Sequence, residues 1–242
     1  MIRRLAFLGA GLALAAASHA HAQAVQMRFT PRVGMVTHYR MNSRIWSSAD
    51  TAGAPTTQST VYQTETVLPP DGANSVVKTV WDSTVMGGGA GGRDMLRGMA
   101  TTVTMDPSGH VVSTQVTPPP GLPPFVGNML TKNAGSGDNP RRRVWPEGTI
   151  SPGYTWTDTM VVTSGSGRSA KRTTVHVTYK FERLEHEAGE RIAVISMHSQ
   201  PEEGVTLTGE MAVNIDAGRL AHLVTDMVQA QGRVKTTMET LP

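Results

Sequence analysis

Few side chains in this sequence stand at spacings that catalysis would need. Ser75 and Lys78 have the Ser-x-x-Lys spacing of penicillin-binding enzymes, in which a helix brings the amine to the hydroxyl. Here both residues lie in a predicted strand, which points side chains three positions apart to opposite faces. The glycine-rich run 87–92 is followed by Arg-Asp and not by the Lys and hydroxyl residue of a phosphate-binding loop, so it indicates a hairpin tip.

The other titratable residues form no catalytic or metal-binding set that their spacing would support. The sequence has no Gly-x-Ser-x-Gly motif, and His186-Glu187 lacks the second histidine of a zinc-binding helix. His176 and His198 could approach each other across adjacent strands, which leaves a weak metal site conceivable. We therefore predict a protein that is not an enzyme and that has no cofactor and no metal site.

The N-terminus has the three regions of a secretory signal peptide. Arg3-Arg4 precedes an uncharged run of Leu, Ala, Gly and Phe from Leu5 to Ala17, and Ala20-His21-Ala22 supplies small residues before a cleavage site. Cleavage before Gln23 would remove residues 1–22 and leave a periplasmic or secreted protein without a transmembrane anchor. The alternative is a retained anchor, but the apolar run is shorter than the roughly 20 residues that span a bilayer.

Composition limits the partners of the mature chain, residues 23–242. Without the two arginines of the signal peptide it has 20 basic and 19 acidic side chains, which gives no electrostatic reason to expect a nucleic acid. Arg141–Arg143 either contacts anionic headgroups or belongs to a solvated linker. The chain has no cysteine, so neither a lipid-modified cysteine nor a disulfide can form.

Alternation with a period of two residues dominates the chain after the signal peptide, and helical periodicity is rare. Val175, Val177, Tyr179 and Phe181 share one face of a predicted strand, opposite polar residues. Residues 191–198 place apolar side chains on both faces, which predicts a strand covered on both sides. The pattern predicts a mostly β protein with antiparallel strands, hairpins and at most one or two short helices.

One short stretch of sequence occurs twice. Residues 99–112 resemble residues 211–224, because in each copy a strand ends in Asp, turns at Gly109 or Gly218 and returns as a second strand. We expect a positive φ at both glycines. We also expect the aspartate at the start of each turn to accept hydrogen bonds from turn amides.

The segments before the two hairpins also follow in the same order: a glycine turn, an alternating strand and a more apolar strand. We predict an internal duplication with halves of about 23–120 and 145–242, joined by a Pro-, Gly- and Arg-rich linker at 117–150. A chance likeness between hairpins is the alternative. Two such meanders would form one large curved sheet, a half-barrel or open barrel. Phe125–Lys132 in the linker predicts a short helix that either caps the sheet or is an accidental turn.

Methionine is the residue type that most favours a ligand. The chain has 14 methionines, and their flexible thioether side chains fill irregular apolar space and adapt to varied partners. A concave sheet lined by methionine, valine and leucine could accept an acyl chain, whereas methionines that only fill gaps in the core are the alternative. The side chains predicted to face a ligand are Met105, Tyr154, Trp156, Met211 and Ile215.

A further pattern carries a resemblance to known proteins. Gly153-Tyr154-Thr155-Trp156, preceded by WPEGTISP, together with the signal peptide and the Asp-x-Gly hairpins, resembles an uncharacterised family of exported bacterial β-rich proteins. That family is similar in architecture to lipoprotein-localisation factors and mycobacterial-type lipid carriers. The resemblance implies acyl-chain binding on the concave face of a curved sheet covered by helices. Those carriers begin with a long helix, whereas residues 24–34 here predict a strand that runs into a turn.

These observations predict an exported, non-enzymatic protein that binds an apolar or lipidic ligand in the concavity of a curved β-sheet. The alternative is a structural or protein-interaction module of the cell envelope. Such a module would dock a protein partner through its sheet edges and the glycine-rich loop at 87–92.

Overall fold

The computed structural model describes residues 24–28, 30–47, 53–87, 94, 96–122, 145–164, 171–200, 204–229 and 232–242. The signal peptide, the predicted helix Phe125–Lys132, Arg141–Arg143 and most of the glycine-rich run lie outside the described residues. Within them the chain forms 13 strands and no helix, as the alternation predicts. No helix in this part of the chain is long and apolar enough to cross a membrane.

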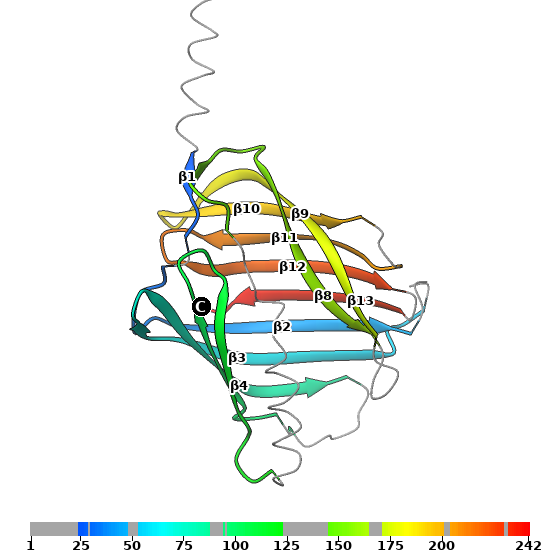
Figure 1. Ribbon diagram of the computed structural model, residues 1–242. Helices are drawn as coiled ribbons and strands as arrows, with labels where there is room; N and C mark the ends of the chain where they lie inside the picture. Colours follow the sequence, from blue (N-terminus) through cyan, green and yellow to red (C-terminus); the bar gives the residue numbers. More distant parts are fainter. Residues whose placement is uncertain are drawn as a thin grey trace, which may run out of the picture.

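Eleven strands form one antiparallel sheet, and two short strands form a separate ribbon (Figure 1). The sheet has the order β6-β5-β4-β3-β2-β13-β12-β11-β10-β9-β8, and the ribbon pairs β1 with β7. The strands are β1 Val25–Gln26, β2 Val36–Trp46, β3 Thr57–Asp71, β4 Asn74–Met86, β5 Ala100–Met105, β6 Val111–Thr117, β7 Thr149–Ile150, β8 Thr155–Ser164, β9 Lys171–Glu187, β10 Glu190–Ser199, β11 Thr206–Asn214, β12 Arg219–Gln229 and β13 Gly232–Thr240.

Two meanders share this sheet. Strands β2 to β6 form the first, strands β8 to β12 form the second, and β13 lies between β2 and β12. Because β13 pairs with both neighbours along its length, the two meanders belong to one continuous sheet and not to two lobes.

The alternation of residue types decides which face of a strand is buried. In β9, Val175, Val177 and Phe181 are fully buried, whereas Thr174 on the other face is exposed. This confirms the predicted half-buried strand. In β10, residues 192–195 are all buried, as expected for a strand covered on both sides, and a bulge within this run shifts its register against β9.

The first of the two similar hairpins has the predicted geometry. Gly109 has a φ of 87°, in the left-handed region that glycine adopts without strain. The Asp106 carboxylate accepts the backbone N–H groups of Ser108 and His110, each at 2.9 Å. The aspartate therefore stabilises the turn as expected.

The second hairpin has the predicted glycine but a different side chain at the start of the turn. Gly218 has a φ of 65°, whereas Asn214 and not Asp216 accepts the turn amides, those of Asp216 and Ala217. The prediction for Asp216 is wrong because β11 ends at Asn214, which places Asp216 inside the turn. Its carboxylate instead binds the amide and the guanidinium of Arg191.

The turns that open the two meanders make the same backbone hydrogen bonds. In both, the N–H of a glycine with positive φ donates to the carbonyl of a strand residue. The N–H of that strand residue donates to the carbonyl of the residue after the glycine. The bonds are Gly34 to Val67 at 2.9 Å and Val67 to Met35 at 2.9 Å in the first meander, and Gly153 to Phe181 at 2.7 Å and Phe181 to Tyr154 at 2.9 Å in the second. Two copies of one meander would share this geometry, and the duplication itself stays a prediction.

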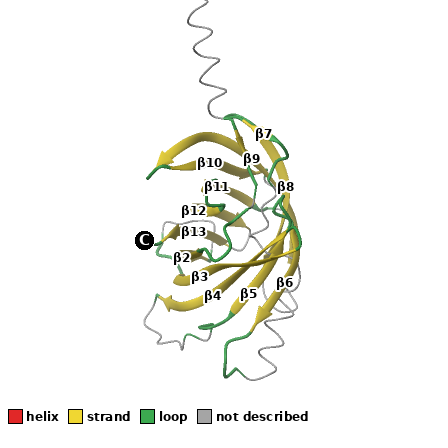
Figure 2. Ribbon diagram, turned by 90° about the vertical axis from the view of Figure 1, so that its left-hand side faces the viewer, coloured by secondary structure: helices red, strands yellow, loops and turns green. Residues whose placement is uncertain are grey.

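The large sheet is strongly curved and its edge strands β6 and β8 do not pair with each other (Figure 2). The β1–β7 ribbon crosses the concave side at one end, where Val25 lies opposite Ile150 and both are buried. The hydrophobic core therefore lies on the concave face of the sheet. This architecture confirms the predicted fold class, a mostly β protein built on one large curved antiparallel sheet.

Candidate ligand-binding face

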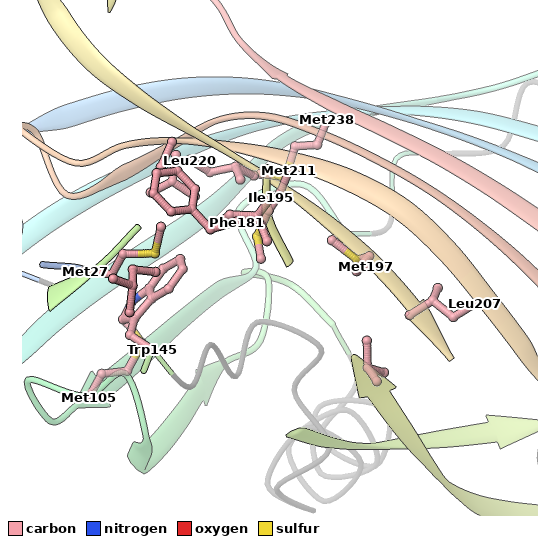
Figure 3. Close-up of a cluster of buried hydrophobic side chains, with 14 of the residues drawn as sticks. Met27, Met105, Trp145, Phe181, Ile195, Met197, Leu207, Met211, Leu220 and Met238 are labelled. Carbon is pink, nitrogen blue, oxygen red and sulfur yellow. The ribbon is translucent and has the colours of Figure 1, made fainter. Parts of the chain in front are cut away.

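Methionines from strands far apart in the sequence gather on the concave face. Five of them belong to the buried cluster and three more are partly buried against it. The buried five are Met27, Met105, Met197, Met211 and Met238, and the partly buried three are Met41, Met160 and Met227. Figure 3 shows the buried five with Phe181, Ile195, Leu207 and Leu220 in one band of side chains. We call this band, with its partly buried neighbours, the methionine stripe.

The structure brings four of the five predicted ligand-facing residues into this cluster. Met105 and Met211 are buried, with 8% and 6% of their surfaces exposed. Met211 lies in the middle of β11, opposite Ile195 of β10, so it is part of the packed core. Trp156 and Ile215 are partly buried against the cluster. A ligand contact at any of these positions stays a prediction.

Tyr154, the fifth predicted residue, lies at the rim of the concave face. It is 44% exposed and its ring centroid is 6.3 Å from that of Trp156. Trp156 in turn stacks on Tyr179 of β9, with centroids 5.4 Å apart and ring planes 16° apart. The three rings therefore form a row across edge strand β8 and its neighbour, and only its outer member is substantially open to solvent.

Partly buried apolar side chains continue the cluster along the middle strands. Register places Met41 of β2 opposite Met238 of β13, which is opposite Leu223 of β12. Met227 of β12 lies opposite Leu207 of β11. These inward positions extend apolar surface beyond the fully buried residues, which is the arrangement that a ligand-binding face needs.

Sequence patterns missed the part of the cluster that lies outside the sheet. Trp145 belongs to the linker predicted at 117–150, yet it is 5% exposed and lies in the core beside Met27. Neither residue sits in an alternating strand, so periodicity carried no signal for them. The one available signal was chemical, because a tryptophan in a Pro- and Arg-rich segment is unusual unless it is buried.

The first hairpin holds Trp145 over the concave face. Its backbone N–H donates to the carbonyl of Ser108 at 3.0 Å, inside the turn that Asp106 stabilises. Burial by itself raises the pKa of Asp106, but hydrogen bonds from the amide and ring of His110 and from the amide of Ser108 outweigh it and hold the pKa below its ordinary value. The carboxylate is therefore charged at neutral pH and can accept these hydrogen bonds.

The convex face carries ion pairs between neighbouring strands. Arg40 of β2 donates to Glu239 of β13 at 2.7 Å, and Arg233 of β13 donates to Asp226 of β12 at 2.7 Å, with Lys235 at 3.6 Å from the same carboxylate. These residues alternate with inward-facing apolar ones, so charge and apolar surface are separated onto the two faces.

The described residues contain no group of three or more His, Asp and Glu side chains that could hold a metal ion. Register places His198 opposite Thr178 and not opposite His176, so the two histidines are diagonal neighbours. The conceivable site at these histidines therefore lacks a third ligand among the described residues.

Comparisons with known proteins add a distant likeness. No protein-family model and no curated protein matches the chain. Among solved structures, it is similar to the hypothetical lipoprotein YmcC from Escherichia coli (K12), with 13% sequence identity and a TM-score of 0.33 over 87% of this chain and 89% of that one. A likeness at this TM-score carries no argument about function, which we therefore argue from the geometry of the concave face.

Proposed function

We propose that this protein is an exported, non-enzymatic binding protein for an apolar or lipidic ligand, held on the concave face of its sheet. The observation that carries the proposal is the methionine stripe, which continues from the packed core into the partly buried side chains Met41, Met160, Leu223 and Met227. Apolar surface left partly in water gains about 25 cal/mol for each Å² that a ligand covers.

The residue type supports the same conclusion. A rigid core is built best from branched side chains, whereas unbranched methionine changes its rotamer at low cost and adapts to ligands of varied shape. Eight methionines in or against one cluster on the concave side therefore favour a surface that accommodates flexible hydrocarbon chains. Met105, Met211, Trp156, Tyr154 and Ile215 remain our candidates for contacts at its edge and base.

Export is part of the proposal. The signal-type N-terminus and the absence of cysteine in the chain support a periplasmic or secreted protein without an anchor after cleavage. Native mass spectrometry of protein purified from the periplasm without detergent tests both points. The intact mass reports whether the chain begins at Gln23, and any stoichiometric bound lipid appears as an adduct that extraction then identifies.

A matched pair of variants on one strand tests whether the ligand binds to the concave face. Met227 of β12 is partly buried against the cluster, whereas Val224 of the same strand is 36% exposed and points to the other face. Met227→Gln should weaken binding of the fluorescent probe N-phenyl-1-naphthylamine about tenfold, or about 1.4 kcal/mol, because an amide buried against the ligand lacks a partner. Val224→Gln should leave binding unchanged. Equal effects, or a probe that does not bind folded wild-type protein, would refute the proposal.

A specific observation favours the alternative function as an envelope interaction module. Edge strand β6 contains no charged residue and no proline, the features that usually protect an edge from pairing, and its Val112 is 59% exposed. A protein partner could add a strand there. An apo mass together with a partner cross-linked to β6 would favour this function over lipid binding.

A further inference from the structure

Trp145 carries a buried hydrogen-bond donor that has no acceptor among the residues that the structure describes. The residue is 5% exposed, and its indole Nε1 is buried without a partner. An indole N–H can only donate, and leaving it unpaired in an apolar environment is unfavourable. Trp46 shows the contrast, because its Nε1 donates to the carbonyl of Gly53 at 3.1 Å.

The backbone of Trp145 is held in place, and its side chain is buried. The amide N–H bonds to Ser108 of the β5–β6 turn, and Ile150, shortly after it, pairs with Val25 in the ribbon. Figure 3 shows Trp145 beside Met27 and Met105 at one end of the methionine stripe, with Met197 and Leu207 at the other.

The stripe offers an apolar path away from this donor. Along β12 alone, the partly buried inward positions from Leu223 to Met227 span about 13 Å at 3.3–3.4 Å per residue. A ligand whose acceptor meets Trp145 can therefore lay a hydrocarbon chain over the middle strands.

The charges of the inner face disfavour an anionic head for this ligand. Alternation places Glu65 on the inward face of β3 and Asp158 on the inward face of β8. Of the basic side chains that the structure describes within strands, Arg191 is the one at an inward position. It forms an ion pair with Asp216, with 2.6 Å between its guanidinium nitrogen and the carboxylate oxygen. The others take outward positions: Arg40, Arg44, Lys78, Lys180, Arg183, Arg219, Arg233 and Lys235. On this face a carboxylate finds acidic side chains and, among the described strand residues, no unpaired basic one, whereas a neutral carbonyl needs no such partner.

We propose that Trp145 Nε1 donates a hydrogen bond to the neutral carbonyl oxygen of an acyl ester or amide, whose hydrocarbon chain lies along the methionine stripe. This inference rests on the proposed function and specifies its ligand class. Trp145 then selects acylated molecules with a neutral head over plain hydrocarbons and over free fatty acids.

Displacement of N-phenyl-1-naphthylamine by methyl octanoate, octanoate and octane tests the inference in the full mature chain. Trp145→Phe keeps an aromatic ring, although a smaller one, and removes the donor. It should weaken methyl octanoate about tenfold, which is about 1.4 kcal/mol, while octane and the probe bind as before. The matched control, Trp46→Phe, removes a donor that already has a partner in the protein and should change none of the three.

A direct readout in wild-type protein covers the case in which Trp145→Phe fails to fold. The indole N–H resonance of Trp145, assigned by backbone connectivity, should shift downfield with methyl octanoate and stay in place with octane. An unmoved resonance, an equal loss for ester and octane in Trp145→Phe, or octanoate that binds as tightly as the ester would overturn the inference while the proposed function stands. Failure of the probe and all three ligands to bind would overturn both.

Discussion

Gly218 lies in the turn of the second hairpin and packs against Thr30 and Pro31, in the segment that leads from the ribbon into β2. Replacing Gly218 by alanine tests this packing. Its φ of +65° lies in the left-handed region. A Cβ at this position would lie 3.0–3.1 Å from the backbone N and Cα of Pro31 and the carbonyl carbon of Thr30. Backbone atoms cannot move aside as a flexible side chain can.

Gly72 in the β3–β4 turn provides the matched control. It has a φ of +61°, and a Cβ there meets nothing within 4 Å. Gly72→Ala carries left-handed strain of about 1–2 kcal/mol, offset by about 0.4–1 kcal/mol from the lower entropy of the unfolded chain. We expect a net loss of about 1 kcal/mol. Gly218→Ala adds the steric conflict with Pro31, about 1–3 kcal/mol for forced overpacking, which brings its loss to about 2–4 kcal/mol.

Urea unfolding followed by circular dichroism measures both losses from the midpoint and slope of the transition. The double variant should show nearly additive losses, because the two turns belong to different hairpins. Equal destabilisation by the two single variants would show that the segment 30–31 does not pack on the turn. That result would refute the inference that contact with the second hairpin holds residues 30–31 in place.

Two further predictions concern the core and the acid limit of stability. Phe181→Ala removes a fully buried ring opposite Ile195 and should lower the free energy of unfolding by about 3–5 kcal/mol. Phe181→Leu should cost much less, because it keeps most of the buried volume. Equal losses of the two variants in urea unfolding would contradict tight packing. Hydrogen bonds from Arg233, against the effect of burial, hold the pKa of Asp226 below its ordinary value. A carboxyl group whose pKa is lowered by folding stabilises the fold at pH values above its pKa in the unfolded chain, about 3.9 for aspartate. This contribution is lost as pH falls through the folded-state pKa. Asp226→Asn should therefore be less stable than wild type at neutral pH and lose less stability on acidification. Parallel acid profiles for wild type and Asp226→Asn would contradict this.

The strands could be predicted because their pattern is local. Val175, Val177 and Phe181 alternate with polar residues, and any partner strand on that face buries the same side chains. Gly109 and Gly218 were predicted with positive φ because each turn needs a residue without a Cβ clash. The role of Asp216 could not be predicted, since it depends on where β11 ends and on Arg191 of the neighbouring strand.

The inward direction of some candidate residues could be predicted for the same reason. Met105 and Met211 belong to alternating strands, so their inward direction follows from the sequence, and the structure places both in the core cluster. The burial of Trp145 and Met27 was not predicted, because both residues reach the cluster from irregular segments. Their positions follow from the ribbon pairing and from the bond to Ser108, which join residues far apart along the chain.

The sequence by itself determined the β class, the direction of side chains within each strand and the glycine turns, since each of these follows from the chemistry of a few consecutive residues. Tertiary structure alone decided that β13 joins the two meanders into one curved sheet and that the β1–β7 ribbon crosses one end of it. Period-two alternation states which residues share a face but not which strand lies beside it. Pairing between distant strands is chosen by the burial of the whole face, and that choice brings Trp145 and the methionine stripe together.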